Sequence, residues 1–179
     1  MAVRKIKASD FQIDLFDKID QAISDLDRMK LQVGWFEGTR YDTNTPVAEV
    51  AIKNEFGDPI NNIPPRPFMR PTIKAQRDNW KKFSSQAAKR IINRKASPDK
   101  VLEIMGLSIA GEVRTTIARL DKPALSRKTI EQRLSVRKDK RTIGLLEKPL
   151  VFEGLLLNSV SYIVNDGEIV KPFSRYEAP

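Results

Sequence analysis

The chain has no cysteine and no histidine among its 179 residues. The lack of cysteine excludes a disulfide framework and a thiolate metal site. The lack of histidine removes the most common general base and metal ligand, and with them the histidine-based catalytic triads. Metal binding or acid–base catalysis would therefore depend on carboxylates or lysines alone.

Several other functional signals are missing. No apolar run reaches the roughly 20 residues of a membrane-spanning helix, and the N-terminal sequence MAVRKIKASDF lacks the apolar core of a signal peptide. Glycines do not cluster ahead of a helix as in a phosphate-binding loop. The pairs Asp14/Asp17 and Asp25/Asp27 lack the pattern of a calcium loop. We expect a soluble protein that is not an enzyme, without cofactor, metal, membrane or small-molecule substrate.

The composition is that of a globular protein with excess positive charge. Hydrophobic residues make up 40% and charged residues 31% of the chain, and domains cluster at roughly 100–150 residues, so we expect one domain over residues 1–179. The net charge of +9 falls within Arg66–Lys100, where eleven lysines and arginines face only Asp78 and Asp99. Such charge suits an anionic partner, although a solvated basic surface explains it as well.

Hydrophobic spacing of three and four residues predicts three long helices. The first covers residues 10–30, and the second is basic and runs from Phe68 or Pro71 to about Lys95. The third follows Ser97 and Pro98, a good cap and first helical residue, and runs to Leu120. The short turn between the second and third helices predicts an antiparallel pair.

A shorter helix and a stiff loop occupy residues 45–71. Thr45 is the predicted cap of this helix, Pro46 its first residue and Gly57 its left-handed stop. The predicted inward side chains are Val47, Val50, Ala51 and Phe56. The prolines of Asp58–Pro71 exclude regular helix and central strand there, and Pro71 fits the first turn of the basic helix.

The remaining elements are short. Alternation predicts strands at Leu31–Gly38 and Val160–Val164, with Glu168–Phe173 as a further candidate. Helical turns are predicted at Thr129–Leu134 and Glu153–Ser159. The fold class is therefore α+β, a small antiparallel or mixed β-sheet packed by long α-helices.

Two basic or polar stretches are expected to be flexible or peripheral. The first is residues 121–148, where Ser135–Thr142 has no apolar period. The second is a C-terminal tail at 166–179. Cations of the first stretch would contact DNA or a neighbouring subunit. These cations are Arg133, Arg137, Lys138, Lys140 and Arg141.

The loop before the basic helix is unusually rich in proline, arginine and aromatic residues. Prolines pre-order an extended segment, and aromatic and arginine side chains on such a segment are typical of interface anchors. A rigid surface loop would use the same prolines, so this alternative stays open. The predicted protein interface consists of Asn54, Glu55, Phe56, Ile63, Pro64, Pro65, Arg66, Pro67, Phe68, Arg70 and Pro71.

Nucleic-acid binding is the alternative function. The basic helix carries Trp80 and Phe83, but both fall on its apolar stripe, which favours a place in the core over base stacking. No helix-turn-helix, zinc or RNA-binding signature accompanies the charge. A stand-alone basic nucleic-acid-binding protein would therefore act by loose electrostatic contact with phosphates.

Two blocks of the sequence resemble a known family. In Leu31–Ile73 a strand reading VGWFEG precedes TPVAEVAIKNEFG, IPPRPFMRPTI and a basic helix, and Lys148–Val164 reads KPLVFEGLLLNSVSYIV. These blocks resemble the neck or tail-completion proteins of tailed bacteriophages, a group of virion morphogenesis and minor tail proteins. In that family an "A…N/HEFG…IP(P/A)RPF(F/M)RP" segment precedes a C-terminal "PL-D-T-G-L-S-(I/V)-Y-V" block. Phe152-Glu153 departs from its usual Asp-Thr pair.

The resemblance implies a structural virion protein, made in the host cytoplasm and located at the head–tail junction. Such subunits form rings that join the head connector to the tail around the DNA path. The implied partners are further copies in a hexameric or dodecameric ring, other neck, head-closure and tail-terminator proteins, and genomic DNA in non-specific contact. Asn54–Gly57 and Ile63–Pro71 would carry the contacts between subunits or rings.

Overall fold

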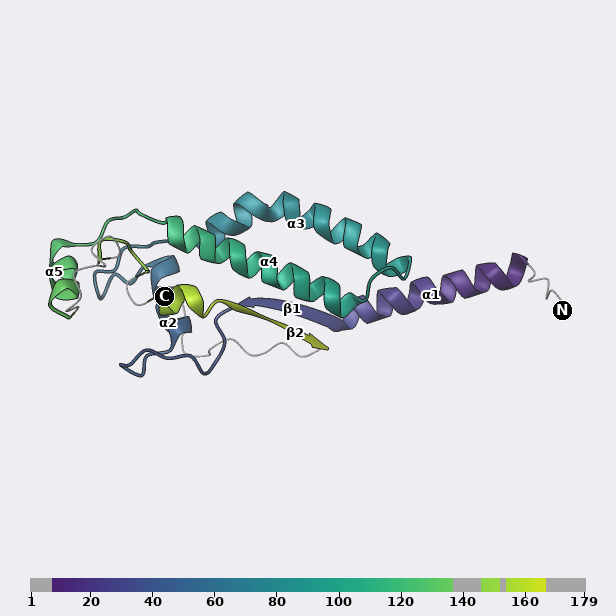
Figure 1. Ribbon diagram of the computed structural model, residues 1–179, viewed down its shortest axis with the longest axis horizontal. Coiled ribbons are helices and arrows are strands. Elements are labelled where there is room, and N and C mark those ends of the chain that lie inside the picture. Colours follow the sequence, from purple (N-terminus) through teal and green to yellow (C-terminus); the bar gives the residue numbers. More distant parts are fainter. Residues whose placement is uncertain (1–7, 137–145, 152–153, 167–179) are drawn as a thin grey trace.

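The computed structural model describes residues 8–136, 146–151 and 154–166, without the side chains of 8–15, 136 and 166 (Figure 1). It is mostly helical, with one two-stranded sheet in the described part, and confirms the α+β class. In chain order its elements are α1 (Ala8–Arg28), β1 (Met29–Gly34), α2 (Val47–Phe56), α3 (Met69–Ile92), α4 (Pro98–Arg119), α5 (Arg127–Val136), α7 (Leu155–Asn158) and β2 (Ser161–Asp166).

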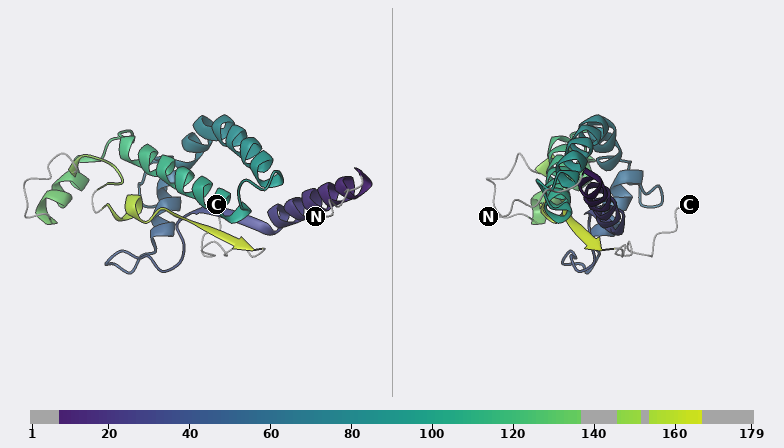
Figure 2. Two further views of the ribbon diagram at one scale, coloured as in Figure 1. Left: turned by 45° about the vertical axis from the view of Figure 1, so that its right-hand side comes forward. Right: turned by 90° about the vertical axis from the view of Figure 1, so that its right-hand side faces the viewer.

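The two strands come from opposite ends of the chain and pair antiparallel. Met29 lies opposite Asp166, and Gly34 lies opposite Ser161. In Figure 1, α4 lies between these strands and α3, while α1 continues outward from the start of β1. Figure 2 shows the same projection of α1 beyond the body from a second direction. The described molecule is therefore elongated, with α1 at one end and α5 at the other.

Helix α4 packs on the sheet through small and branched residues. Gly106, Ala110, Val113 and Ile117 are its buried positions, and their spacing of three and four places them on one face. A methyl group at Gly106 would lie 2.6 Å from the Tyr162 ring and 2.9 Å from Leu31. Gly106 therefore lets α4 approach both strands. A methyl group at Gly111 would meet no atom within 4 Å.

This contrast gives a matched pair of substitutions. Gly106→Ala is expected to destabilise the protein by about 1–3 kcal/mol, because the added methyl group overpacks the helix–sheet contact. Gly111→Ala is expected to stabilise it by up to about 1 kcal/mol, because alanine is the better helix former. Urea unfolding followed by circular dichroism measures both, and the same sign for the two substitutions would contradict the packing described here.

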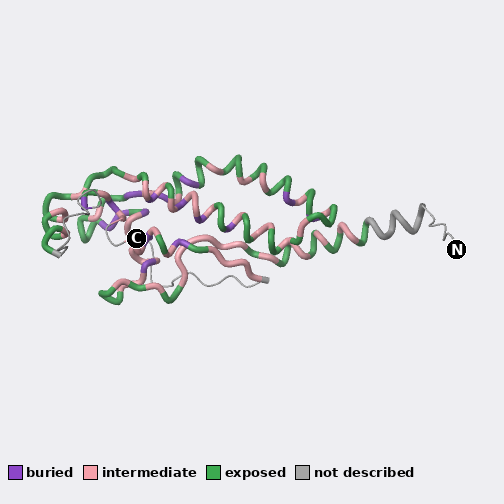
Figure 3. The backbone as a smooth tube through the Cα atoms, viewed as in Figure 1, coloured by how far each residue is buried: buried purple, intermediate pink, exposed green. Residues whose placement is uncertain are grey.

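The hydrophobic core lies at the end of the molecule near α2 and α7. Figure 3 shows the buried positions gathered where the start of α3 and the end of α4 meet these short helices. The ring of Trp35 packs against this core, and its Nε1 donates a hydrogen bond of 2.8 Å to the carbonyl of Leu156. The buried cluster contains Val47, Ala51, Phe68, Ala110, Val113, Ile117, Leu156 and Val160.

The three long helices, the short helix before Gly57 and both strand positions are confirmed, with boundaries shifted by a few residues. The strands pair antiparallel, which is one of the two arrangements, antiparallel or mixed, that the sequence left open. The candidate strand Glu168–Phe173 lies outside the described residues. Helix α5 is longer than the predicted Thr129–Leu134 and gives regular structure to part of the stretch expected to be flexible.

Three details of α2 are corrected. Phe56 is exposed, whereas its neighbour Glu55 is buried, because the last turn of α2 directs the carboxylate toward the start of α3. Thr45 does not cap the helix, since its hydroxyl pairs with that of Thr43 at 3.0 Å and Pro46 occupies the cap position. The helix ends at Gly57 as predicted, with φ at +85°, but ψ is 166°, so Gly57 does not adopt the left-handed helical conformation that was predicted.

Candidate assembly surface around the proline loop

The loop from Gly57 to Phe68 begins with a tight, hydrogen-bonded turn. Asp58 and Ile63 pair through two backbone hydrogen bonds of 2.9 Å each. A side chain at Gly57 would be strained by its positive φ and would lie 3.1 Å from the carbonyl of Ile63 and from Pro65. Glycine at position 57 is therefore required both for the end of α2 and for the packing of the turn.

The turn is also fixed by the side chain of Asp58. Its Oδ2 accepts a hydrogen bond of 2.7 Å from the amide of Asn61, and its Oδ1 accepts one of 3.3 Å from the Asn61 backbone. The Asn61 amide holds the pKa of Asp58 below its ordinary value, against the opposing effect of burial, and the charge of Lys53 contributes. The tip of this ordered turn is Ile60, whose side chain is 92% exposed.

The carboxylate of Glu55 caps the N-terminus of α3. It accepts hydrogen bonds from the backbone N–H groups of Phe68 at 2.7 Å, Met69 at 2.9 Å and Arg70 at 3.1 Å. These N–H groups have no partner within their own helix, and the helix dipole favours negative charge at this end. Glu55, a predicted interface residue, thus joins α2 to α3 inside the subunit.

The charge of Glu55 is stabilised despite its burial. Desolvation raises the pKa of a buried carboxyl, but the N–H groups of Phe68, Met69 and Arg70 and the Arg70 guanidinium lower it. The balance places the pKa of Glu55 below its ordinary value, so the side chain is ionised at neutral pH. The resulting charge-assisted hydrogen bonds fix the position of the loop between α2 and α3.

Arg70 lies between this buried cap and the solvent. Its Nε donates to Glu55 Oε1 at 2.9 Å, and its Nη2 donates to the Glu55 carbonyl at 2.7 Å. Its guanidinium carbon lies 4.9 Å from the centroid of the Phe56 ring, in a cation–π arrangement. Both side chains remain exposed, so the structure holds an aromatic ring and an arginine in a fixed outward position.

The structure corrects the predicted placement of Arg66 and Phe68, whose side chains are buried rather than directed toward a partner. Phe68 is 0% exposed and packs edge-on against Trp35, with ring centroids 5.3 Å apart. Arg66 donates from Nε to the Pro123 carbonyl at 3.0 Å and from Nη2 to the Ala124 carbonyl at 3.3 Å. Burial lowers the pKa of Arg66. Both side chains support the loop from within.

Some of the other predicted interface residues are half-buried, and the rest are exposed to solvent. Asn54 is half-buried, and its carbonyl accepts the backbone N–H of Arg66 at 2.6 Å. Ile63 and Pro67 are half-buried. The exposed residues Asn61, Asn62 and Pro64 line a cavity on one side of the loop. The exposed residues that do not line this cavity form what we call the outer face of the loop. This outer face contains Phe56, Pro59, Ile60, Pro65, Arg70 and Pro71.

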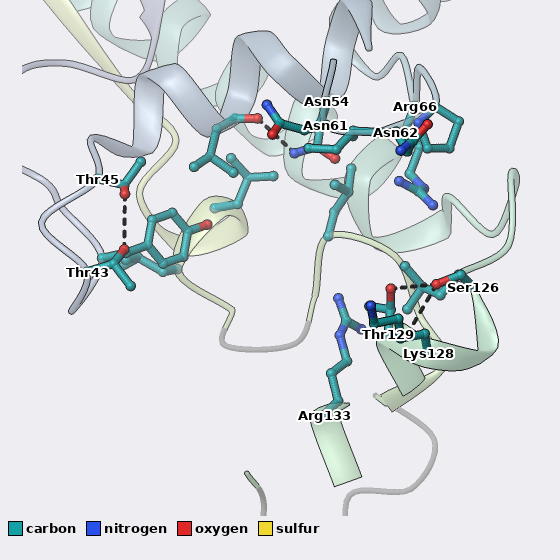
Figure 4. Close-up of a pocket in the computed structure, with 18 of the residues that line it drawn as sticks. Thr43, Thr45, Asn54, Asn61, Asn62, Arg66, Ser126, Lys128, Thr129 and Arg133 are labelled. Carbon is teal, nitrogen blue, oxygen red and sulfur yellow. Dashed lines mark hydrogen bonds between the residues drawn. The ribbon is translucent and has the colours of Figure 1, made fainter. Parts of the chain in front are cut away.

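A cavity of about 960 Å³ lies on the other side of the loop, between it and α5 (Figure 4). Among the described residues that line it, Asp42 is the only carboxylate. Arg66 is bound to backbone carbonyls, and Arg133 donates at 2.9 Å to the carbonyls of Leu146 and Lys148. The guanidinium groups in this cavity therefore connect segments of the chain, and its described lining residues include no carboxylate pair of the kind used in acid–base catalysis.

The predicted cationic contact region is described only in part. Arg133 lies on α5, which Ser126 caps by accepting the Thr129 backbone N–H at 3.2 Å. The other four predicted cations, Arg137, Lys138, Lys140 and Arg141, lie outside the described residues. Arg133 is half-buried and has the internal partners given above, so its position favours a structural role in holding α5.

The sequence does not single out two residues that matter at this site. Thr72 is buried and hydrogen-bonds to the Phe68 carbonyl and the Thr116 hydroxyl, both at 2.6 Å, which ties the first turn of α3 to α4. Ile60 precedes the predicted Ile63–Pro71 segment. The signal that could have placed Ile60 at the exposed tip of a turn is the set of turn-forming residues around it, Asp58, Pro59, Asn61 and Asn62.

The described residues offer no metal site and no membrane-spanning helix. In the part of the chain that the structure describes, no group of three acidic residues could hold a metal ion. None of the described helices is long and apolar enough to span a membrane. Comparison of the chain with family models, curated proteins and solved structures found no match in any of the three.

Proposed function

We propose that this protein is a structural virion subunit of a tailed phage. In this role it is a neck or tail-completion protein that forms an oligomeric ring between the head connector and the tail, around the DNA path. Its partners are further copies of the chain and other neck, head-closure and tail-terminator proteins. The observation that carries the proposal is the outer face of the loop, which exposes Ile60, Phe56 and Arg70 on a rigid support.

The support gives this surface the properties of a protein interface. An anchor that is already ordered loses little conformational entropy on binding. The loop is already ordered in the isolated subunit by Gly57, by the Asp58–Ile63 pairing and by the Glu55 cap. The buried side chains of Arg66 and Phe68 support it from the inner side. The exposed isoleucine at the tip of the turn and the arginine-stacked phenylalanine at the end of α2 provide apolar area and a directed cation.

Ile60→Ser in the phage that encodes this chain tests the proposal. Loss of one interface anchor costs about 2 kcal/mol or more, roughly 30-fold in affinity. We expect particles that fail at head–tail joining, seen by electron microscopy as separate filled heads and free tails, together with reduced infectivity.

Ile60→Val is the matched control, because it keeps an apolar side chain at the tip, and it is expected to leave joining intact. The purified Ile60→Ser chain should unfold at the same urea concentration as the wild type, since Ile60 contributes little to the core. Normal particles from Ile60→Ser phage would count against the outer face as an assembly surface.

A second function, stand-alone binding of nucleic acid, is favoured by one observation. Along α3 the cations Lys74, Arg77, Lys81, Lys82, Lys89 and Arg90 are exposed. Mass measurement of the purified chain with and without duplex DNA, over a range of salt concentrations, separates the two functions. A monomer that binds DNA tightly with a steep salt dependence supports this second function and opposes the ring.

A further inference from the structure

Helix α1 exposes an apolar stripe on a segment that projects from the body. Among its described side chains, Phe16 is 65% exposed and Ile23 is 54% exposed. Ile19 and Leu26 are half-buried and follow the same spacing of three and four residues. These four residues therefore lie on one face of α1. Figures 1 and 2 show α1 extending away from α3, α4 and the sheet.

A helix of this kind gains most of its stability from packing of its apolar face. Phe16 is largely exposed, so the described part of its own subunit does not supply that packing there. The stripe is continuous from Phe16 to Leu26 and is flanked by aspartates, a pattern that fits a partner helix with an apolar stripe and positive charge beside it.

The charge of α1 decides between two ways of pairing copies of the chain. Helix α1 contains six aspartates against Lys18 and Arg28. Two α1 helices packed on each other would bring like charges together, which opposes association. Helix α3 contains seven lysines and arginines against Asp78. An α1 helix placed along α3 of a second copy would instead bring opposite charges together.

Helix α4, the neighbour of α3, supplies apolar residues for the same contact. Ile104 and Leu107 are exposed, the latter at 59%, and Gly111 continues their spacing with open space beside it. These positions lie on a different side of α4 from the face buried on the sheet. Helices α1 and α4 have 21 and 22 residues, so each is roughly 32 Å long and the two can lie side by side along their whole length.

We propose that α1 of one copy packs along the α3–α4 hairpin of the next copy, with Phe16 and Ile23 against Ile104 and Leu107 and the aspartates of α1 near the cations of α3. The two contact surfaces differ, so the contact is heterologous: each copy offers one α1 and one hairpin. Such contacts repeat from copy to copy and close into a ring when the rotation allows. The inference rests on the proposed ring function and names the contact that would build it.

Two double variants of the full chain test this contact. Phe16→Ser with Ile23→Ser removes the stripe of α1, and Ile104→Ser with Leu107→Ser removes the stripe of the hairpin. The mass of each is measured by size-exclusion chromatography with light scattering, and circular dichroism verifies the fold. We expect the wild type to be oligomeric and each variant alone to be monomeric.

Mixing the two variants gives the decisive result. The hairpin variant keeps a working α1, and the α1 variant keeps a working hairpin, so one contact of the proposed kind can form. An equimolar mixture should therefore produce a dimer and nothing larger. An α1–α1 contact predicts instead that the hairpin variant alone stays oligomeric, and that result would overturn the inference.

The dependence of the oligomer mass on ionic strength tests the same contact independently. If aspartates and lysines face each other, the wild-type oligomer should shift toward monomer as ionic strength rises. A wild type that is monomeric up to its solubility limit, or variants that keep the wild-type mass, would overturn the α1 contact. Neither result decides the proposed function, because the Ile60→Ser phage tests head–tail joining directly and does not involve α1.

Discussion

Replacing Phe68 with alanine is expected to lower the free energy of unfolding by about 3–5 kcal/mol, the range for removing a fully buried phenylalanine. Its ring is completely buried and packs edge-on against Trp35 within the cluster that includes Val113 and Ile117. The buried cluster around it draws most of its residues from α2, α4 and α7, which cannot all move to fill the space. Chemical denaturation monitored by circular dichroism measures this loss.

Phe56→Ala is the matched control, because it removes the same kind of side chain from the last residue of α2, twelve positions before Phe68. Phe56 is exposed and its main contact is the Arg70 guanidinium, a cation–π pair worth about 0.5–1 kcal/mol at such sites. The expected loss of stability is therefore under about 1 kcal/mol. Similar losses for Phe56→Ala and Phe68→Ala would contradict the inward and outward assignment of the two rings.

The difference between these two phenylalanines affects how an interface is tested. A variant that combines Phe68→Ala with Arg70→Ala would fail in assembly because the subunit itself is destabilised. Phe56 and Ile60 are better targets, since both are exposed and neither belongs to the buried core. Loss of assembly with unchanged unfolding then reports on the interface alone.

Most of the secondary structure follows from periodicity and from turn chemistry. The spacing of apolar residues predicts the long helices, and Gly57 and Pro98 mark a helix end and a helix start that the structure confirms. Pairing of β1 with β2 joins segments more than 120 residues apart, and both were predicted as strands. These elements are predictable because each depends on neighbours within a few residues.

The direction of side chains in the proline loop could not be predicted in the same way. Composition indicates that Arg66, Phe68 and Arg70 are unusual together, but not which of them faces the core. That depends on contacts distant in sequence: Arg66 with the carbonyls of Pro123 and Ala124, and Phe68 with Trp35. Arg70 reaches the buried Glu55 carboxylate with its Nε, while most of its own side chain stays exposed.

Glu55 shows the same limit for a charged residue. Its place in the last turn of α2 suggests an exposed acid near the end of a helix, where the dipole disfavours negative charge. In the structure its carboxylate caps the N-terminus of α3, where it accepts the backbone N–H groups of Phe68, Met69 and Arg70. One side chain thereby satisfies backbone groups of α3 and orients the arginine of the outer face.

Glu55→Ala is expected to destabilise the protein by roughly 3 kcal/mol, because hydrogen bonds to a charged group contribute about 1.5–3 kcal/mol each and the freed N–H groups lie in a buried site. Arg70 would also lose its bond to the carboxylate, which loosens the outer face. Glu49→Ala is the control: Glu49 forms a partly exposed pair with Lys53 one turn apart, worth about 0.3–0.5 kcal/mol. A loss for Glu55→Ala no larger than that for Glu49→Ala would contradict the capping role.

The pH dependence of stability isolates the charge of Glu55 from its volume. Because folding lowers its pKa, ionised Glu55 stabilises the folded state above its ordinary pKa of 4.5, and this contribution is lost as the pH falls from there through the lower folded-state value. Asp58, whose pKa is also lowered, titrates in the same acid range. The comparison is therefore made with Glu55→Gln, which keeps Asp58. We expect the wild type to be more stable than Glu55→Gln at pH 7, with the difference shrinking below about pH 4.5; a difference independent of pH would show that the charge does not form the cap.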